Sequence, residues 1–197
     1  KPTMEQLTVA KLMELLNSPD PFVRRDAWLA AGPLGAAALR PLADLAATGD
    51  LEISRAANRG MWQIVRYVGA PGREELRRPV VETLGEMVGD TRLPIQLRRD
   101  IVWMLSEIIK DEEIDQASAL PLLLDPDLGE DVRMALQRVA GPNAIGVLKA
   151  GFTQAQGEHK TAIACSLRKC GIAIDEPPCP KLVPRKTTTV KPVGRDA

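Results

Sequence analysis

The sequence predicts an all-α chain, folded as an α-α superhelix (a right-handed solenoid) of about five helix pairs. One observation is the composition: hydrophobic residues make up 45% of the 197 residues, but aromatic residues only 3%. The core must therefore be filled by aliphatic side chains, which favours stacked helices over strands, since strands draw on aromatic and β-branched residues. The other observation is an apolar pattern at helical spacing that recurs along the chain.

The recurring pattern is clearest in the second helix of each pair. Residues 23–35 carry apolar side chains at helical spacing, and residues 132–142 repeat the Val-Arg start and the Ala-Gly-Pro ending. The middle copies align on tryptophan, because the residues one before, two after and six after each Trp are apolar. A fifth copy spans residues 159–171. The aligned tryptophans are Trp28, Trp62 and Trp103, and the expected helix ends are Gly35, Gly69 and Lys110.

A partner helix is expected before each of these second helices. Turn-forming residues separate the two helices of a pair, and an Asp in such a turn can cap the following helix through its side chain. Three partner helices carry a proline inside or just after the first turn, where it is tolerated: Pro41, Pro79 and Pro121. The expected partner helices are residues 4–17, 36–48, 74–89, 114–124 and 143–156.

Residues 15–35, LLNSPDPFVRRDAWLAAGPLG, resemble the HEAT-like repeat of the phycobilin-lyase type. That pattern runs Leu-Leu, a turn with Asp-Pro, then Val-Arg, then Ala and a Leu-Gly ending. Residues 125–141 repeat it with two extra turn residues, and residues 39–69 match a helix pair. The resemblance covers about residues 4–172 and implies an armadillo-like α-solenoid. We expect a repeat domain over residues 1–176 and an extended Pro-, Lys- and Thr-rich tail over residues 177–197.

Charge and hydropathy limit the classes of partner. The chain has 26 basic and 26 acidic residues, so its net charge gives no electrostatic reason to expect general nucleic-acid binding. No apolar run approaches the roughly 18 residues that a membrane helix needs. No signal peptide is visible, and the chain begins at Lys1 without Met, so we expect a fragment or a processed form. A cytoplasmic location is slightly preferred, and an exported one is the alternative.

The residues that carry chemistry do not predict an enzyme, a metal or a cofactor. The one histidine, His159, aligns with Val23 of the repeat and is expected to be structural. Cys165, Cys170 and Cys179 lack the tight pairs of a zinc site. Three reduced thiols are preferred, and a Cys170–Cys179 disulfide is the alternative in an exported chain. The acidic runs 111–113 and 74–75 are expected on solvated faces or at helix termini.

Arginine and tryptophan recur on the second helices and are the candidate partner-binding residues. One interpretation is structural: each Arg pairs with an Asp of the neighbouring repeat, and each Trp completes the core edge. The other is functional: a concave face presents both residue types to a partner, as at many interfaces. The candidates are Arg24, Arg59, Arg99, Arg133, Trp28, Trp62 and Trp103.

The tail suggests a ligand for the repeat domain. From residue 177 it holds five basic residues against one acidic, which leaves 21 basic and 25 acidic residues in the repeat domain. We therefore expect the tail to dock on its own solenoid or on a neighbouring one.

The leading functional interpretation is a non-enzymatic protein–protein interaction module or scaffold that presents a helical groove to a protein or peptide. The resemblance implies an alternative, a phycobilin-lyase-like enzyme or chaperone subunit. A nucleic-acid-binding helical repeat protein is the remaining alternative, since the Arg and Trp series suits one even though the net charge does not.

Overall fold

The computed structural model describes residues 7–178 of the chain, and that range is all-helical. It contains ten α-helices and two short 3-10 helices, with no strand in the range described. The α-helices are α1 (Val9–Leu16), α2 (Pro21–Leu29), α3 (Ala36–Thr48), α4 (Leu51–Val68), α5 (Glu74–Gly89), α6 (Ile95–Ile108), α7 (Gln116–Leu123), α8 (Gly129–Val139), α9 (Pro142–Gln154) and α10 (Gly157–Lys169). The 3-10 helices are η1 (Gly32–Leu34) and η2 (Asp111–Glu113).

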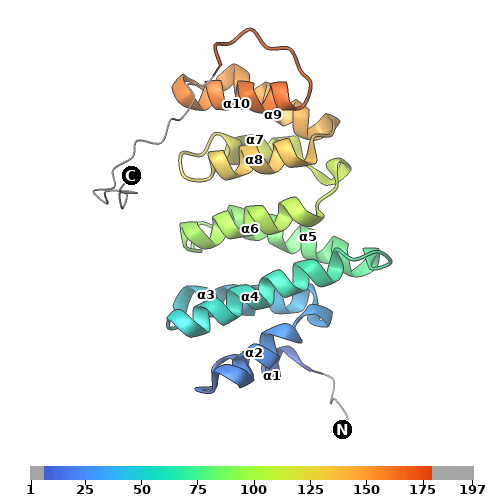
Figure 1. Cartoon of the computed structure of the whole chain (residues 1–197), viewed down its shortest axis with the longest axis vertical. Coiled ribbons are helices and arrows are strands. Elements are labelled where there is room, and N and C mark those ends of the chain that lie inside the picture. Colours follow the sequence, from blue (N-terminus) through green and yellow to red (C-terminus); the bar gives the residue numbers. More distant parts are fainter. Residues whose placement is uncertain (1–6, 179–197) are drawn as a thin grey trace, which may run out of the picture.

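Consecutive helices pack as pairs, and the pairs are stacked in chain order along the long axis of the molecule (Figure 1). The second helices, α2, α4, α6, α8 and α10, each contact the next along one side of the stack. On the other side α1 contacts α3, α3 contacts α5, and α7 contacts α9. The core runs between these two rows and is aliphatic, as the composition predicts. Its largest fully buried side chains include Leu12, Leu39, Met61, Ile64, Leu84, Ile101, Met104 and Leu123.

Aspartates start several helices by capping them, as expected from the turn sequences. Asp20 accepts a hydrogen bond from the backbone N–H of Phe22 (2.8 Å), and Asp50 accepts from those of Glu52 and Ile53 (both 3.0 Å). A side-chain oxygen placed there satisfies a donor that has no partner inside the helix. Asp90 differs, because it caps a turn that ends at Arg92 and α6 begins only after Pro94.

The helix bounds confirm some predictions and correct others. The helices expected at 36–48 and 74–89 are confirmed, because α3 and α5 begin and end at those residues. The helix end predicted at Gly35 is wrong. Helix α2 ends at Leu29, and the chain then forms η1. Gly32 precedes a proline, which disfavours helical backbone, and a Cβ on Gly32 would lie 2.7 Å from Cβ and Cγ of Tyr67. The backbone is therefore pressed against α4 at this point.

The remaining bounds differ by a few residues. Helix α4 ends at Val68 and α6 at Ile108, close to the expected ends. Helices α7 and α9 occupy Gln116–Leu123 and Pro142–Gln154 instead of 114–124 and 143–156. Thr8 caps α1 through the N–H of Lys11, so α1 begins at Val9 and not at residue 4.

The three prolines occupy one register. Pro41, Pro79 and Pro121 are each the sixth residue of their helix, counted from the bounds of α3, α5 and α7. A proline there removes the hydrogen bond to the carbonyl four residues earlier, and its ring crowds that carbonyl. The first helices of the second, third and fourth pairs thus carry their proline at the same position.

Beyond α10 the chain carries no regular element within the described range. Residues 170–178 return along α10, where Arg168 donates to the carbonyls of Ile174 (3.2 Å) and Glu176. The rest of the predicted tail, 179–197, lies outside the described residues, as do residues 1–6. Within the described range, no helix combines the length and the apolar character needed to cross a bilayer.

The close approach at Gly32 yields a stability prediction. The substitution Gly32→Ala should lower the free energy of unfolding by about 1–3 kcal/mol, because the new methyl group overlaps Cβ and Cγ of Tyr67. Gly85→Ala, inside α5 with open space at its Cβ position, should raise it by up to about 1 kcal/mol. Urea unfolding followed by circular dichroism measures both, and equal effects of the two substitutions would contradict the prediction.

Candidate functional site

One concave feature of the described residues is a cleft between α5 and α7. Residues of α5 and α7 line its two walls, residues of α6 and α8 line its floor, and η2 with the two residues after it lines one end. Its volume is about 640 Å³, which lies within the range of ligand-binding clefts. We call it the α5–α7 cleft.

The cleft exists because α5 and α7 scarcely touch. Every other pair of neighbouring first helices packs together, namely α1 with α3, α3 with α5, and α7 with α9. Between α6 and α7 the chain inserts η2, and α7 then has only 8 residues. A short helix that starts late cannot cover the face of α5. The floor remains closed, because α6 packs against α8.

Aliphatic side chains line the interior of the cleft. Several are only half-buried, so they present apolar surface that the neighbouring layer would cover elsewhere in the stack. Apolar surface of this kind is what an interaction partner can bury with a gain in free energy. The half-buried aliphatic residues of the lining are Leu105, Ile109, Ile114, Ala119, Leu122, Ala135 and Val139.

The rim of the cleft is acidic. Exposed carboxylates of Glu82, Glu112 and Asp115 line it, and Arg78 is the basic residue of its lining. Glu82 and Glu112 form no ion pair with any other residue of the range 7–178. Glu86 also lines the cleft but pairs with Arg40 of α3 (2.7 Å). The cleft therefore combines an apolar interior with a net negative edge.

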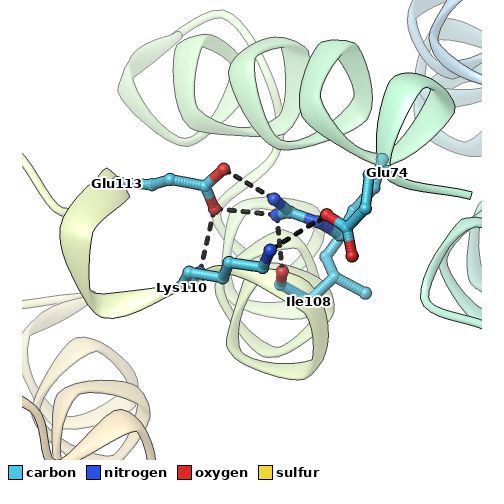
Figure 2. A network of polar contacts seen from close by, with 5 residues as sticks. Glu74, Ile108, Lys110 and Glu113 are labelled. Atoms are coloured by element: carbon cyan, nitrogen blue, oxygen red, sulfur yellow. Dashed lines mark hydrogen bonds and ion pairs between the residues drawn. The ribbon is translucent and has the colours of Figure 1, made fainter. Parts of the chain in front are cut away.

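A buried arginine fixes the chain segment that closes the cleft. Arg77 of α5 donates to both carboxylate oxygens of Glu113 (2.7 and 2.8 Å) and to the carbonyl of Ile108 (2.9 Å). Glu74 accepts from the same guanidinium (3.0 Å) and from Lys110 Nζ (3.0 Å). Figure 2 shows Glu113, Glu74 and Lys110 converging on this centre.

These contacts shift the pKa values of the two carboxyl groups. The hydrogen bond from Arg77 holds the pKa of Glu113 below its ordinary value, and the hydrogen bond from Lys110, followed by that from Arg77, lowers the pKa of Glu74. Both groups are therefore ionised at neutral pH and hold η2 against α5. Through these contacts both carboxylates position the chain segment that closes the cleft.

Two of the predicted partner-binding arginines are used inside the protein. Arg24 donates to the carbonyls of Ser18 (2.6 Å) and Pro19 (3.0 Å), which ties down the turn between α1 and α2. Arg133 is only 8% exposed and donates to Glu130 (2.8 Å) and to the hydroxyl of Ser166 in α10. Arg133 is therefore buried in internal bonds, while Arg24 is half-exposed and uses Nη1 for both of its bonds.

At one junction the structure shows the Arg–Asp link that the structural interpretation expects. Arg99 of α6 lies 3.5 Å from Asp131 of α8, and Trp103 donates from Nε1 to the same carboxylate (2.9 Å). Two other aspartates of the second helices behave differently. Asp26 pairs with its neighbour Arg25, and Asp100 accepts from Asn58 of α4 (2.8 Å).

Trp28 and Trp62 stand at the edge of the core. Both are half-buried and pack against it, and an arginine lies over each ring at 5.9 Å. The arginines are Arg59 over Trp28 and Arg66 over Trp62. Arg59 is exposed, so of the seven predicted residues it is the most accessible to a partner. None of the seven lines the α5–α7 cleft.

His159 has a structural position, as the repeat alignment predicts. Its Nε2 lies 2.8 Å from the carbonyl of Leu123 and donates to it, because a carbonyl oxygen can only accept. A Cβ on Gly129 would lie 3.1 Å from Cε1 of the ring, so the imidazole fills the space beside that glycine. The histidine thus joins the start of α10 to the end of α7.

The cysteines give no further site within the described range. Cys165 Sγ lies 3.9 Å from Nη1 of Arg168, and burial raises the pKa of the Cys170 thiol. Cys179 lies outside the described residues, so the Cys170–Cys179 disulfide stays a prediction. Over residues 7–178, no three His, Cys, Asp or Glu side chains are grouped in a way that could hold a metal ion.

Sequence reasoning missed the cleft, although the acidic run 111–113 was a signal. The run was expected on a solvated face or at a helix terminus. Asp111 does lie at a terminus, that of α9, where it accepts from the N–H groups of Asn143 and Ala144 (both 2.9 Å). Glu113 binds Arg77, and only Glu112 of the run is exposed. The run is therefore the linker that displaces α7.

Comparisons with known proteins identify no family. No family model matches the chain, and no curated protein matches it. Among solved structures it is similar to an engineered protein from the Northeast Structural Genomics Consortium, with 21% identity over 82% of this chain and 78% of that one and a TM-score of 0.41. A likeness this low carries no argument, so the HEAT-like resemblance stays a prediction.

The pKa of Glu113 yields a pH-dependent prediction. Glu113→Gln should lower the free energy of unfolding by about 2 kcal/mol at pH 7, since charge-assisted hydrogen bonds to Arg77 are lost. The folded-state pKa lies below the ordinary value of 4.5, so this contribution is complete above that pH and is lost as the pH falls through the folded-state pKa. Urea titrations at pH 7 and pH 3 should therefore show a smaller difference at pH 3.

Glu112→Gln is the matched control for this measurement. Glu112 is the exposed neighbour and forms no ion pair within the described range, so its substitution should change stability by less than about 0.5 kcal/mol at either pH. A loss at Glu113 that is independent of pH would show that the ionised carboxylate is not the cause.

Proposed function

We propose that this protein is a non-enzymatic interaction module that binds a protein or peptide, built as a right-handed superhelix of five HEAT-like helix pairs. The stacked order of the ten described helices and the shared register of three prolines support the repeat architecture. A stack of copied units exposes a long surface in proportion to its core, and repeat proteins use such surfaces for binding.

The single observation that carries the proposal is the α5–α7 cleft. It is an apolar groove with an acidic edge, in a protein whose other neighbouring first helices close against each other. Its half-buried aliphatic lining gives a partner apolar surface to bury, and the rim selects the charge of what enters. The partner that fits is a segment with apolar residues beside Lys or Arg.

The Arg and Trp row on the second helices is the weaker candidate surface. Arg24, Arg99 and Arg133 already donate to groups of the protein, and Trp103 donates to Asp131. A partner at that row would have to compete with these bonds, which gives little net gain. Arg59 with Trp28 remains as a secondary contact in this proposal, because that cation is exposed.

The rival functions make different demands on the same cleft. A nucleic-acid backbone would meet the carboxylates of Glu82 and Glu112 instead of a basic stripe, which opposes binding. A phycobilin-lyase-like enzyme or chaperone subunit would need the cleft to take a tetrapyrrole. Titration of bilin into the pure protein, followed by absorbance, tests that alternative directly.

A charged substitution inside the cleft tests the proposed function. Ala119→Lys places a cation and a long side chain on the half-buried face of α7 that lines the cleft. It should weaken binding of a purified partner at least about tenfold, which corresponds to about 1.4 kcal/mol. The partner is first isolated from the native source on immobilised full-length protein and then titrated by isothermal calorimetry.

Ala117→Lys is the matched control, because Ala117 lies on the same helix, is exposed and does not line the cleft. Its affinity should equal that of the unsubstituted protein within about twofold. Equal affinity for all three proteins would place the partner elsewhere and overturn the role of the cleft.

A further inference from the structure

The α5–α7 cleft has walls made of helices, and this limits the form of a segment that can bind in it. Most of its lining residues lie inside α5, α6, α7 and α8, where the backbone N–H and C=O groups bond along the helix. The walls therefore present side chains, and not the row of open donors and acceptors that a sheet edge offers to an extended peptide. A segment that enters such an apolar cleft has to satisfy its own backbone groups, which an α-helix does and an extended chain does not.

Each wall also carries residues with short side chains. The α5 residues that line the cleft recur at the spacing of one helix face, and Gly85 lies among them. Gly85 is exposed, and a Cβ placed there would meet no other part of the described chain within 4 Å. On the other wall, α7 lines the cleft with Ser118 and Ala119. A glycine inside a helix lowers the stability of that helix, but it lets another backbone approach closely.

The two walls set the length of the contact. Cleft-lining residues run from Arg78 to Val88 on α5 and from Asp115 to Leu122 on α7. At 1.5 Å per residue these stretches are about 15 Å and about 10 Å long, which is about two to three helical turns. A helix lying in the cleft therefore contacts it through residues at i, i+3, i+4 and i+7, which form one face of about that length.

The charge of the rim determines which charges the bound helix carries. Glu82 on α5 and Glu112 in η2 are exposed, and neither forms an ion pair with another residue of the range 7–178. Cations placed where the apolar face of a bound helix meets solvent can pair with these carboxylates. Carboxylates at the same positions would be repelled.

We propose that the α5–α7 cleft binds one amphipathic α-helix of a partner protein, with aliphatic residues against the walls and Lys or Arg beside them. The inference rests on the proposed function, because both place the partner in this cleft, and it specifies the form of the partner. The bound helix completes the row of first helices, whose other neighbouring members contact each other. Its backbone passes close to Gly85, and its cations lie at Glu82 and Glu112.

Peptide selection on the full-length chain tests this form. Random sixteen-residue peptides are displayed on phage and selected on the immobilised protein. Peptides that still bind Ala119→Phe are then removed, because that neutral side chain fills the cleft without favouring either charge. The remaining peptides should share aliphatic residues spaced three and four apart, together with Lys or Arg. Aliphatic residues at every second position, or a preference for Asp and Glu, would overturn the proposal.

The affinity of a selected peptide for two glycine variants tests the close approach. Gly85→Leu should weaken binding at least about tenfold in isothermal calorimetry, since its side chain occupies the place of the bound backbone. Gly89→Leu is the matched control, because Gly89 is exposed on the same helix, has open space at its Cβ position and does not line the cleft. Its affinity should stay within about twofold, and circular dichroism verifies that both variants are folded.

Substitutions in the peptide test its helical form. Alanine at two solvent-facing positions should give an affinity about fivefold higher than valine at the same positions, because β-branched residues disfavour a helix. An extended peptide would reverse this order, since valine favours extended backbone.

A charge swap tests the contact with the rim. Glu82→Lys should weaken a Lys-bearing peptide about fivefold, and replacing the facing Lys of the peptide by Glu should restore binding. Glu75→Lys is the control, because Glu75 is exposed on the same helix and does not line the cleft. An equal loss for Glu75→Lys and Glu82→Lys would show that the rim does not recognise the peptide.

The outcomes separate this inference from the proposed function. If the cleft-dependent peptides bind in an extended form or carry Asp and Glu, the helix proposal falls and the proposed function stands. If Gly85→Leu leaves their affinity unchanged, the placement of the helix beside α5 is overturned. If no selected peptide depends on the cleft, the helix proposal falls, and titration of the purified partner against Ala119→Lys then decides the proposed function separately.

Discussion

The burial of apolar faces between successive helix pairs is the constraint on which the rest of this structure depends. Helix α4 shows it best, because its seven buried residues lie among side chains from the pairs on both sides. Neither α3 nor α4 could hide that surface in a free pair. Each junction between pairs therefore sets the stability of its two neighbours, and one poorly matched junction exposes apolar surface that the remaining junctions keep buried.

The junction between the third and fourth pairs is the poorly matched one, and polar groups hold it in place. Arg77 reaches from α5 to the end of α6 and to Glu113, so the linker that keeps α7 away from α5 is itself fixed. A second buried arginine links the helices of the third pair: Arg98 of α6 donates to the carbonyl of Val88 in α5 (2.7 Å). An arginine suits such sites because its planar fork of donors satisfies several acceptors together. The apolar opening is thus held by a specific polar network and does not reflect loose packing.

The sequence predicted the helical class, the order of the pairs and the bounds of α3 and α5, because periodicity and turn residues act locally. It predicted the end of α2 wrongly: α2 ends at Leu29, and the chain that follows lies against Tyr67, which is 35 positions from Gly32 along the chain. It also directed attention to Arg24 and Arg133, whose partners are a turn carbonyl and a neighbouring helix. The cleft arises because α5 and α7 do not pack against each other. Periodicity and turn residues describe single helices, so they cannot predict which helices stay apart.

The open junction also has a mechanical meaning. Between the third and fourth pairs the two parts of the stack are joined mainly along one edge, through α6 and α8, while α5 and α7 stand apart on the other. A layered body fastened along one edge bends there first. A ligand that filled the space between α5 and α7 would act as a wedge between the first three helix pairs and the last two. Occupancy at one groove would in this way alter the curvature of the whole molecule.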